Sequence, residues 1–379
     1  MTVSLRPKTL TPGPSPTRTP ARPGEGKLPA LRQAVAALAL AGWVLLAGCG
    51  REEPEGGAGA EPQGPVVVYS SVDDVFARPV AQRFQEETGI EVRLVPDTEE
   101  TKSTGLLNRL IAEKERPQAD VFWSGDPVRA AVLKRRGLSA SYRSPAATGL
   151  PPRFSDPEGH WTGFSARARV LIYNREKVPE EQAPDSIFDL VEPRFRGQAC
   201  IANPLFGTTS MHAAALFAAL GEQRARQLFE DFTANGGRIV SSNGEVRRRV
   251  ANGECTVGIT DTDDANVARL EGKPVGIVFP DADGIGTLII PNAAVLIAGA
   301  PHPEAGRRFI DFLLAPETEK ALAASEAAQM PVRPGLPPPA GLPALAGLKA
   351  MEVDYGGLAA LLEELSRGFL KEWVDRNSG

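Results

Sequence analysis

Five aspartates along this chain of 379 residues lie in polar loops that follow apolar, strand-like segments. In open α/β sheets the loops at the carboxyl ends of the strands meet at one edge and form ligand sites. Carboxylates gathered there could hold a ferric or divalent metal ion, or the cationic end of a zwitterion such as an aminophosphonate. A simpler role is helix capping, above all where two of the five precede a helical pattern. The candidates are Asp73, Asp126, Asp261, Asp263 and Asp264.

A second group of polar residues could bind an anion. Gly207-Thr208-Thr209-Ser210 precedes an apolar helical segment over 211–220. Small residues before a helix leave backbone N–H groups and hydroxyls that suit an oxyanion. Thr209 or Ser210 could instead be an ordinary N-cap. Three serines occupy similar loops after strands: Ser70, Ser71 and Ser124.

Strands and helices alternate along the chain in a way that would bring these loops together. Val66–Tyr69 is a continuous apolar run, which indicates a strand buried on both faces. A helical pattern follows and ends near Gly89. Strand–helix–strand alternation predicts parallel strands with right-handed crossovers in an α/β fold. Further strands are expected at 90–95, 119–123, 169–173, 200–202, 239–240, 255–259, 287–290 and 293–297, and further helices at 105–114, 302–314 and 358–373.

The N-terminal segment has the pattern of a secretory signal. An apolar run over 31–47 has Lys27 before it and Arg32 at its start, and it leads into Leu46-Ala47-Gly48-Cys49. The run is shorter than the roughly 20 residues that a membrane-spanning helix needs. Its end resembles the lipobox of bacterial lipoproteins, which implies a lipid on Cys49 and a periplasmic or other extracytoplasmic location on the membrane. We therefore expect a signal peptide with an N-terminal extension at 1–48 and a flexible, lipidated tether at 49–65.

Charge and motifs narrow the class of function. Residues 1–48 hold six Lys/Arg and one acidic residue, so their removal takes the net charge from −5 to −5 − 5 = −10. An acidic protein lacks the basic patch that nucleic-acid binding needs. The absence of G-x-S-x-G, H-E-x-x-H and P-loop motifs favours a binding protein over an enzyme. A metal-dependent hydrolase and a chemosensory receptor are the alternatives.

Two cysteines remain after Cys49, and each begins a short apolar strand pattern. Cys200 and Cys255 are an even pair in a chain that we expect to be exported, which is compatible with a disulfide. Two buried free thiols are the alternative.

Six ordered segments over residues 66–333 resemble the ferric-iron-type periplasmic solute-binding proteins of ABC importers, within the type II periplasmic-binding-protein superfamily. The resemblance implies a two-lobed α/β fold with two interlobe crossovers and a ligand cleft between the lobes. Lobe 1 would comprise 66–165 and 288–379, including the C-terminal helix, and lobe 2 with the hinge would comprise 166–287. The segments are VVVYSSVDDVFARPVAQRFQEETGIEV, ADVFWSGDP, FSARARVLIYN, GTTSMHAAALFAALG, SSNGEVRRRVANGE and GIGTLIIPNAAVLI.

The resemblance also implies a ligand, although the chain departs from the family's iron site. Arg167 and Asn243 match residues that contact an anion, phosphate or carbonate, which shares the metal. Iron-binding members carry adjacent tyrosines where this chain has Thr262 and Asp263, and a histidine where it has Asp73. The family's acidic ligand matches Gly125, beside Asp126.

We therefore expect the solute-binding protein, a monomer, to deliver its ligand to an ABC permease in the cytoplasmic membrane. The preferred ligand is iron(III) or another metal with a synergistic anion, held by carboxylates. The alternative is a phosphate- or phosphonate-containing organic solute bound without metal.

Overall fold

The first part of the chain forms the alternating strands and helices that the sequence predicts. The computed structural model describes residues 64–97 and 104–377. β1 pairs in parallel with β2 and with β3, so the predicted parallel arrangement is confirmed here. α1 ends where Gly89 takes φ 71°, a left-handed conformation that glycine adopts at little cost. The elements are β1 (Val66–Ser70), α1 (Asp74–Thr88), β2 (Val92–Pro96), α2 (Thr104–Ala112), β3 (Val121–Ser124), α3 (Pro127–Arg135) and β4 (Ser139–Ala140).

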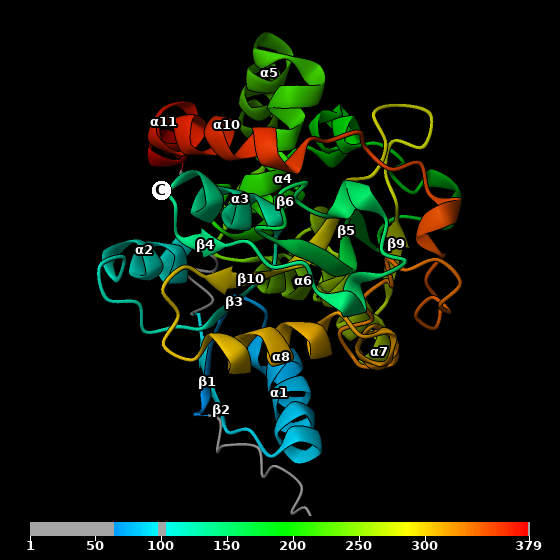
Figure 1. The fold of residues 1–379 in the computed structure, drawn as a ribbon. Coiled ribbons are helices and arrows are strands. Elements are labelled where there is room, and N and C mark those ends of the chain that lie inside the picture. The colour runs from blue at the N-terminus through cyan, green and yellow to red at the C-terminus, as the bar shows by residue number, and fades with distance from the viewer. Residues whose placement is uncertain (1–63, 98–103, 378–379) are drawn as a thin grey trace, which may run out of the picture. The chain divides into compact units, whose positions relative to one another are not determined.

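Two long antiparallel strands connect this part to the rest of the sheet (Figure 1). β5 (Thr162–Asn174) is buried along its whole length, as is β10 (Ile289–Ile297). Within the described residues the sheet has the order β2-β1-β3-β10-β5-β8-β6-β7, with β4 beside β10 and β9 beside β5. The mixed α/β fold with two crossing strands is the predicted fold class.

The second part of the sheet carries helices that begin directly after its strands. α7 follows β8 without an intervening residue, while short loops separate β6 from α4 and β7 from α6. The N-termini of these helices therefore lie at the carboxyl ends of neighbouring strands, where ligands bind in open α/β sheets. The elements are β6 (Ala199–Ala202), α4 (Gly207–Leu220), α5 (Glu222–Ala234), β7 (Arg238–Val240), α6 (Asn243–Ala251), β8 (Val257–Asp261), α7 (Thr262–Leu270) and β9 (Val275–Val278).

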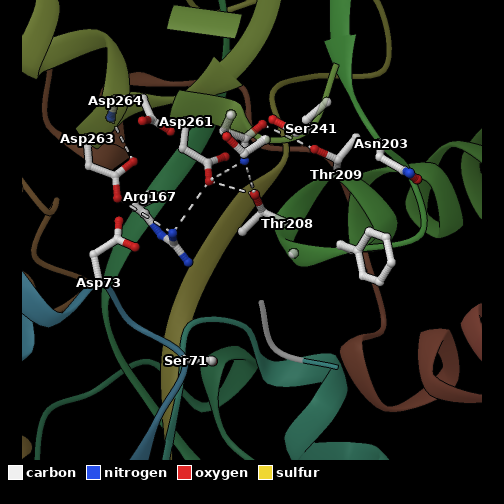
Figure 2. Close-up of a pocket in the computed structure, with 15 residues that line it drawn as sticks. Ser71, Asp73, Arg167, Asn203, Thr208, Thr209, Ser241, Asp261, Asp263 and Asp264 are labelled. Carbon is white, nitrogen blue, oxygen red and sulfur yellow. Dashed lines mark hydrogen bonds and ion pairs between the residues drawn. The ribbon is translucent and has the colours of Figure 1, made fainter. Parts of the chain in front are cut away.

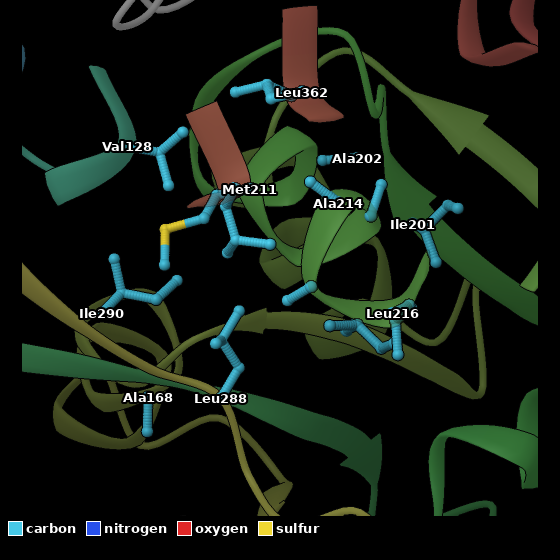
Figure 3. Packing of buried hydrophobic residues seen from close by; sticks show 14 of the residues in the cluster. Val128, Ala168, Ile201, Ala202, Met211, Ala214, Leu216, Leu288, Ile290 and Leu362 are labelled. Atoms are coloured by element: carbon cyan, nitrogen blue, oxygen red, sulfur yellow. The ribbon is translucent and has the colours of Figure 1, made fainter. Parts of the chain in front are cut away.

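The C-terminal helices contact both parts of the fold. α10 (Tyr355–Arg367) packs against α3 and α4, and Met211 of α4 lies among Val128, Ile290 and Leu362 in a common core (Figure 3). α11 (Phe369–Asn377) places Trp373 against Phe229 of α5, with ring centroids 5.0 Å apart. The family resemblance implies that this region belongs to lobe 1 alone, but α10 and α11 also contact α4 and α5. The lobe boundaries themselves stay a prediction.

The remaining helices are short or connect the larger elements. They are α8 (Pro303–Leu313), α9 (Pro316–Ala324) and the 3-10 helices η1 (Pro145–Ala147), η2 (Pro152–Phe154), η3 (Glu180–Gln182), η4 (Ile187–Val191), η5 (Pro193–Phe195) and η6 (Leu345–Gly347). Among the residues that the structure describes, no helix combines the length and the apolar character needed to cross a membrane. The predicted signal peptide, the predicted lipidation site Cys49 and most of the predicted tether lie outside the described residues.

The two cysteines of the folded body are buried free thiols. The side chains of Cys200 and Cys255 are hydrogen-bonded to each other, and burial raises the pKa of the Cys200 thiol. In the structure Cys200 and Cys255 are therefore two free thiols and do not form a disulfide.

Candidate functional site

A polar cavity of about 480 Å³, counting space open to solvent, lies where four helices begin (Figure 2). α1, α4, α6 and α7 each contribute residues of their first turn or of the loop before it. Most of the side chains predicted from the sequence come together here: Ser71, Asp73, Arg167, Gly207, Thr208, Thr209, Asn243, Asp261, Asp263 and Asp264.

The centre of the cavity is a carboxylate that already has several partners. Asp261 ends β8, and Arg167 and Arg169 extend toward it from alternate positions of the neighbouring strand β5. The Arg169 Nη1 atom lies 2.7 Å from Asp261 Oδ1, and the Arg167 Nη1 atom lies 3.4 Å from Oδ2. Thr208 Oγ1 donates to Oδ2 at 2.6 Å, and Asn243 Nδ2 donates at 3.3 Å. Four donors therefore occupy the two oxygens of Asp261.

These partners keep Asp261 ionised although it is only 1% exposed. Burial opposes ionisation, but Arg169 and Arg167 outweigh it and hold the pKa of the carboxyl below its usual value. Burial likewise opposes the charge on Arg167, while Asp263 and Asp261 raise the pKa of its guanidinium. The pair of arginines and Asp261 thus form a buried, charged unit.

One side of the cavity is acidic. Carboxylate oxygens of Asp261, Asp263 and Asp264 all lie within 4.8 Å of one another, a spacing that could hold a metal ion. Figure 2 shows Asp73, at the start of α1, on the same side as Asp263 and Asp264. Asp263 Oδ2 lies 3.5 Å from Arg167 Nη1, and Asp263 Oδ1 accepts from the Asp264 N–H at 3.0 Å, so Asp263 also caps α7 locally. Four carboxylates and two guanidiniums give the site a formal charge of −4 + 2 = −2.

The opposite side carries hydrogen-bond donors. α4 begins at Gly207, which takes φ 54°, and its N-cap residue Phe206 makes no side-chain cap bond. The first N–H groups of a helix carry partial positive charge and bind anions when no side chain caps them. Thr208, Thr209 and Asn243 surround this helix start, and Thr209 Oγ1 donates to Asn243 Oδ1 at 3.2 Å. This side suits an oxyanion, as the sequence predicts.

Four predicted site residues lie away from the cavity. Asp126, predicted as a metal ligand, is instead the N-cap of α3: its Oδ1 accepts from the Arg129 N–H at 3.0 Å. Ser124 Oγ donates to the Asp126 carbonyl at 2.6 Å, and Ser70 Oγ accepts from the Val72 N–H. Ser210 Oγ donates to the Gly207 carbonyl at 2.7 Å. In each case the side chain satisfies nearby groups of the protein, which is the capping role that polar residues at helix starts often have.

Five residues in or beside the cavity were not predicted from the sequence: Arg169, Asn203, Phe206, Ser241 and Ser242. Arg169 is fully buried behind the cavity, where its Nη1 also donates to Asn243 Oδ1 at 3.0 Å. It lies two positions after Arg167, so the period of two along a strand could have placed both on one face. The others lie in the cavity lining at or near helix starts.

His212 on α4 is a buried neighbour of this charged unit. Burial and the positive charge of Arg169 lower its pKa to about 3, so the imidazole is neutral in the folded protein at ordinary pH.

The His212 side chain of the unfolded chain binds a proton near pH 6.5, so the stability of the folded protein should fall as pH drops below that value. Between pH 7 and pH 5 we expect the wild-type free energy of unfolding to fall by about 2 kcal/mol more than that of His212→Leu. Urea titrations of both proteins at the two pH values measure this difference. An equal fall in the free energy of unfolding for both proteins would contradict a neutral His212.

The chain's four tyrosines all lie among the described residues, and none lines the cavity. Tyr69 donates to Glu113, Tyr142 donates to Asp311 and Tyr355 donates to the Ile289 carbonyl. No phenol is therefore placed to coordinate a metal in this cavity.

Comparisons with known proteins identify relatives of the whole folded body. Residues 116–355 match the family model described as bacterial extracellular solute-binding protein. The chain is 29% identical over 307 residues to iron uptake protein A1 of Synechocystis sp., covering 77% of this chain and 83% of that protein. It is also 29% identical over 271 residues to a Salmonella typhi periplasmic protein named for binding 2-aminoethylphosphonate, covering 67% and 73%.

Solved structures share the two-lobed fold. Iron-bound HitA from Pseudomonas aeruginosa has a TM-score of 0.73 and 24% identity, covering 80% of this chain and 98% of that chain. AfuA from Actinobacillus pleuropneumoniae, with fructose-6-phosphate bound, has a TM-score of 0.72 and 24% identity, covering 83% and 99%.

Proposed function

The chain belongs to the bacterial extracellular solute-binding proteins, and we propose that within this family it captures a small solute with one cationic and one anionic end. The cationic end would lie among Asp73, Asp263 and Asp264. The anionic end would lie against the start of α4, with Thr208 and Asn243 beside it. The protein would then deliver the solute to an ABC permease, as a monomer held at the membrane by a lipid on Cys49.

One observation carries this proposal: the acidic and donor sides face each other across Asp261. Because Arg169, Arg167, Thr208 and Asn243 already bind that carboxylate, it separates the two sides rather than offering free oxygens. A site charge of −2 favours a ligand that brings positive charge, while an uncapped helix start favours an anion. An aminophosphonate or amino phosphate has both groups in one small molecule.

A metal ion with a synergistic oxyanion is the second candidate, and the close spacing of Asp261, Asp263 and Asp264 favours it. The iron relatives support it as well. Two features rank it second. Ferric iron prefers hard, strongly donating oxygen ligands such as the phenolate of tyrosine. No tyrosine lines this cavity. In addition, Arg167 lies 3.4 Å from Asp261 and 3.5 Å from Asp263, so a metal ion that used all three carboxylates would compete with this guanidinium for two of them.

Calorimetric titration with matched fragments tests whether both ends of the ligand are bound. The purified protein is titrated with 2-aminoethylphosphonate, with ethylphosphonate, which lacks the amine, and with ethylamine, which lacks the phosphonate. We expect the complete zwitterion to bind at least about 100-fold more tightly than either fragment, since each charge-assisted contact contributes about 1.5–3 kcal/mol. Equal affinity for ethylphosphonate and the zwitterion would show that the acidic side takes no part.

A further inference from the structure

An outer compartment of about 900 Å³, counting space open to solvent, adjoins the ligand cavity. The two share the lining residues Asp73, Asp264, Ser241 and Ser242, so a group bound by Asp73 and Asp264 lies next to both spaces. The outer compartment is further lined by Val75, Phe76, Gly244, Arg247, Arg248, Val267 and Glu326. Its walls thus come mainly from the first turns of α1, α6 and α7.

Arg247 differs from the arginines that follow it on α6. Arg248 and Arg249 both pair with Glu245, with Arg249 Nε 2.7 Å from its carboxylate. Arg247 is half-buried, and its guanidinium makes no ion pair or side-chain hydrogen bond with any residue that the structure describes. The other charged groups lining this compartment are Arg248 and the acids Asp73, Asp264 and Glu326. A half-buried guanidinium without a partner is a natural site for an anionic group of a ligand.

Part of the lining of this compartment is apolar. Val75 is 65% exposed, one of two large hydrophobic side chains exposed to this extent among the described residues. Phe76 beside it is half-buried, and both line the compartment with Val267 of α7. The compartment therefore offers a guanidinium and an apolar surface directly outside the acidic side of the cavity.

We propose that the outer compartment binds a carboxylate attached to the cationic end of the solute, with Arg247 as its partner. The solute would then be an amino acid that carries a phosphonate or phosphate. Its ammonium group lies among Asp73 and Asp264, and its carboxylate reaches Arg247. This inference rests on the proposed function and specifies the class of solute that the site takes.

Two compounds that differ only in this carboxylate test the inference. 2-Amino-3-phosphonopropionate is 2-aminoethylphosphonate with a carboxylate on the carbon that bears the amine. Calorimetry on the wild-type protein should give the carboxylated compound a Kd about 10-fold to 100-fold lower. In Arg247→Gln the ratio of the two Kd values should fall to within about twofold, and Arg247→Lys should restore part of it because it keeps the charge. Arg196→Gln is the charge-matched control, since Arg196 is exposed, also lacks an ion pair among the described residues and lies outside the compartment.

Each outcome is decisive. If 2-aminoethylphosphonate binds but the carboxylate adds no affinity, the outer compartment is not a subsite, while the proposed function stands. The inference also fails if Arg247→Gln keeps the wild-type ratio, or if Arg196→Gln changes the ratio as much. If neither compound binds to protein that unfolds cooperatively, the proposed function and this inference both fail.

Discussion

Replacing Arg169 with leucine should lower the free energy of unfolding by about 3–5 kcal/mol, the usual cost of leaving a buried charge without its partner. Arg169 is 0% exposed and forms the shorter of the two ion pairs with the buried Asp261. Since the folded-state pKa of Asp261 is lowered, the ionised carboxylate contributes fully to the stability of the folded protein above the usual carboxyl pKa of about 4. The contribution is lost as pH falls through the folded-state value. Urea unfolding at pH 7 therefore measures the full effect.

Two further variants show whether the effect comes from the buried pair. Arg226→Leu removes an exposed arginine paired with Glu222 and should change stability by less than about 1 kcal/mol. The double variant Arg169→Leu/Asp261→Leu should regain much of the lost stability because no charge is then left unpaired. If Arg169→Leu lowers the free energy of unfolding by less than about 1 kcal/mol, then Arg167, Thr208 and Asn243 are sufficient to stabilise the buried Asp261 carboxylate.

Replacing Asp263 with asparagine should weaken 2-aminoethylphosphonate binding about 10-fold to 100-fold, because an ionic contact to the ammonium group is lost while the side chain keeps its shape. Ethylphosphonate, which has no amine, should lose no affinity. It should gain some, because Arg167 would then have one acidic neighbour fewer. Calorimetric titration of both compounds into the variant separates the two effects.

Asp283→Asn is the control for this variant, because Asp283 is exposed and lies outside the cavity. An equal loss for both compounds in Asp263→Asn would indicate that the cavity collapses. An unchanged affinity for the zwitterion would reduce Asp263 to a cap of α7, through its bond to the Asp264 N–H.

Most strand positions could be predicted from the sequence because most of the strands, apart from the long β5 and β10, are short and mainly apolar runs bounded by polar loops. The cavity follows from that pattern, since α4, α6 and α7 begin at neighbouring strand ends. Asp261, Asp263 and Asp264 come together because they span the junction between β8 and α7. Local sequence sufficed for these features.

Features that depend on contacts distant in sequence could not be predicted in the same way. The bond by which Asp126 caps α3 is local, but its position outside the cavity depends on which strand ends the fold brings together. Arg169 lies inside an apolar strand, and its role depends on Asp261, 92 residues away. The partners of α11 were equally hidden, because Trp373 packs on α5 rather than on a neighbour in sequence.

The most direct test of the proposed function is the thermal midpoint of chelator-treated protein. It is measured with 2-aminoethylphosphonate, with ferric iron, with phosphate, and with ferric iron and phosphate together. A ligand that binds only the folded state raises the midpoint in step with the logarithm of its concentration. We expect 2-aminoethylphosphonate to raise the midpoint without any metal, and ferric iron to add nothing. A shift that requires ferric iron and phosphate together, with none from 2-aminoethylphosphonate, would contradict the zwitterion proposal and establish a metal receptor.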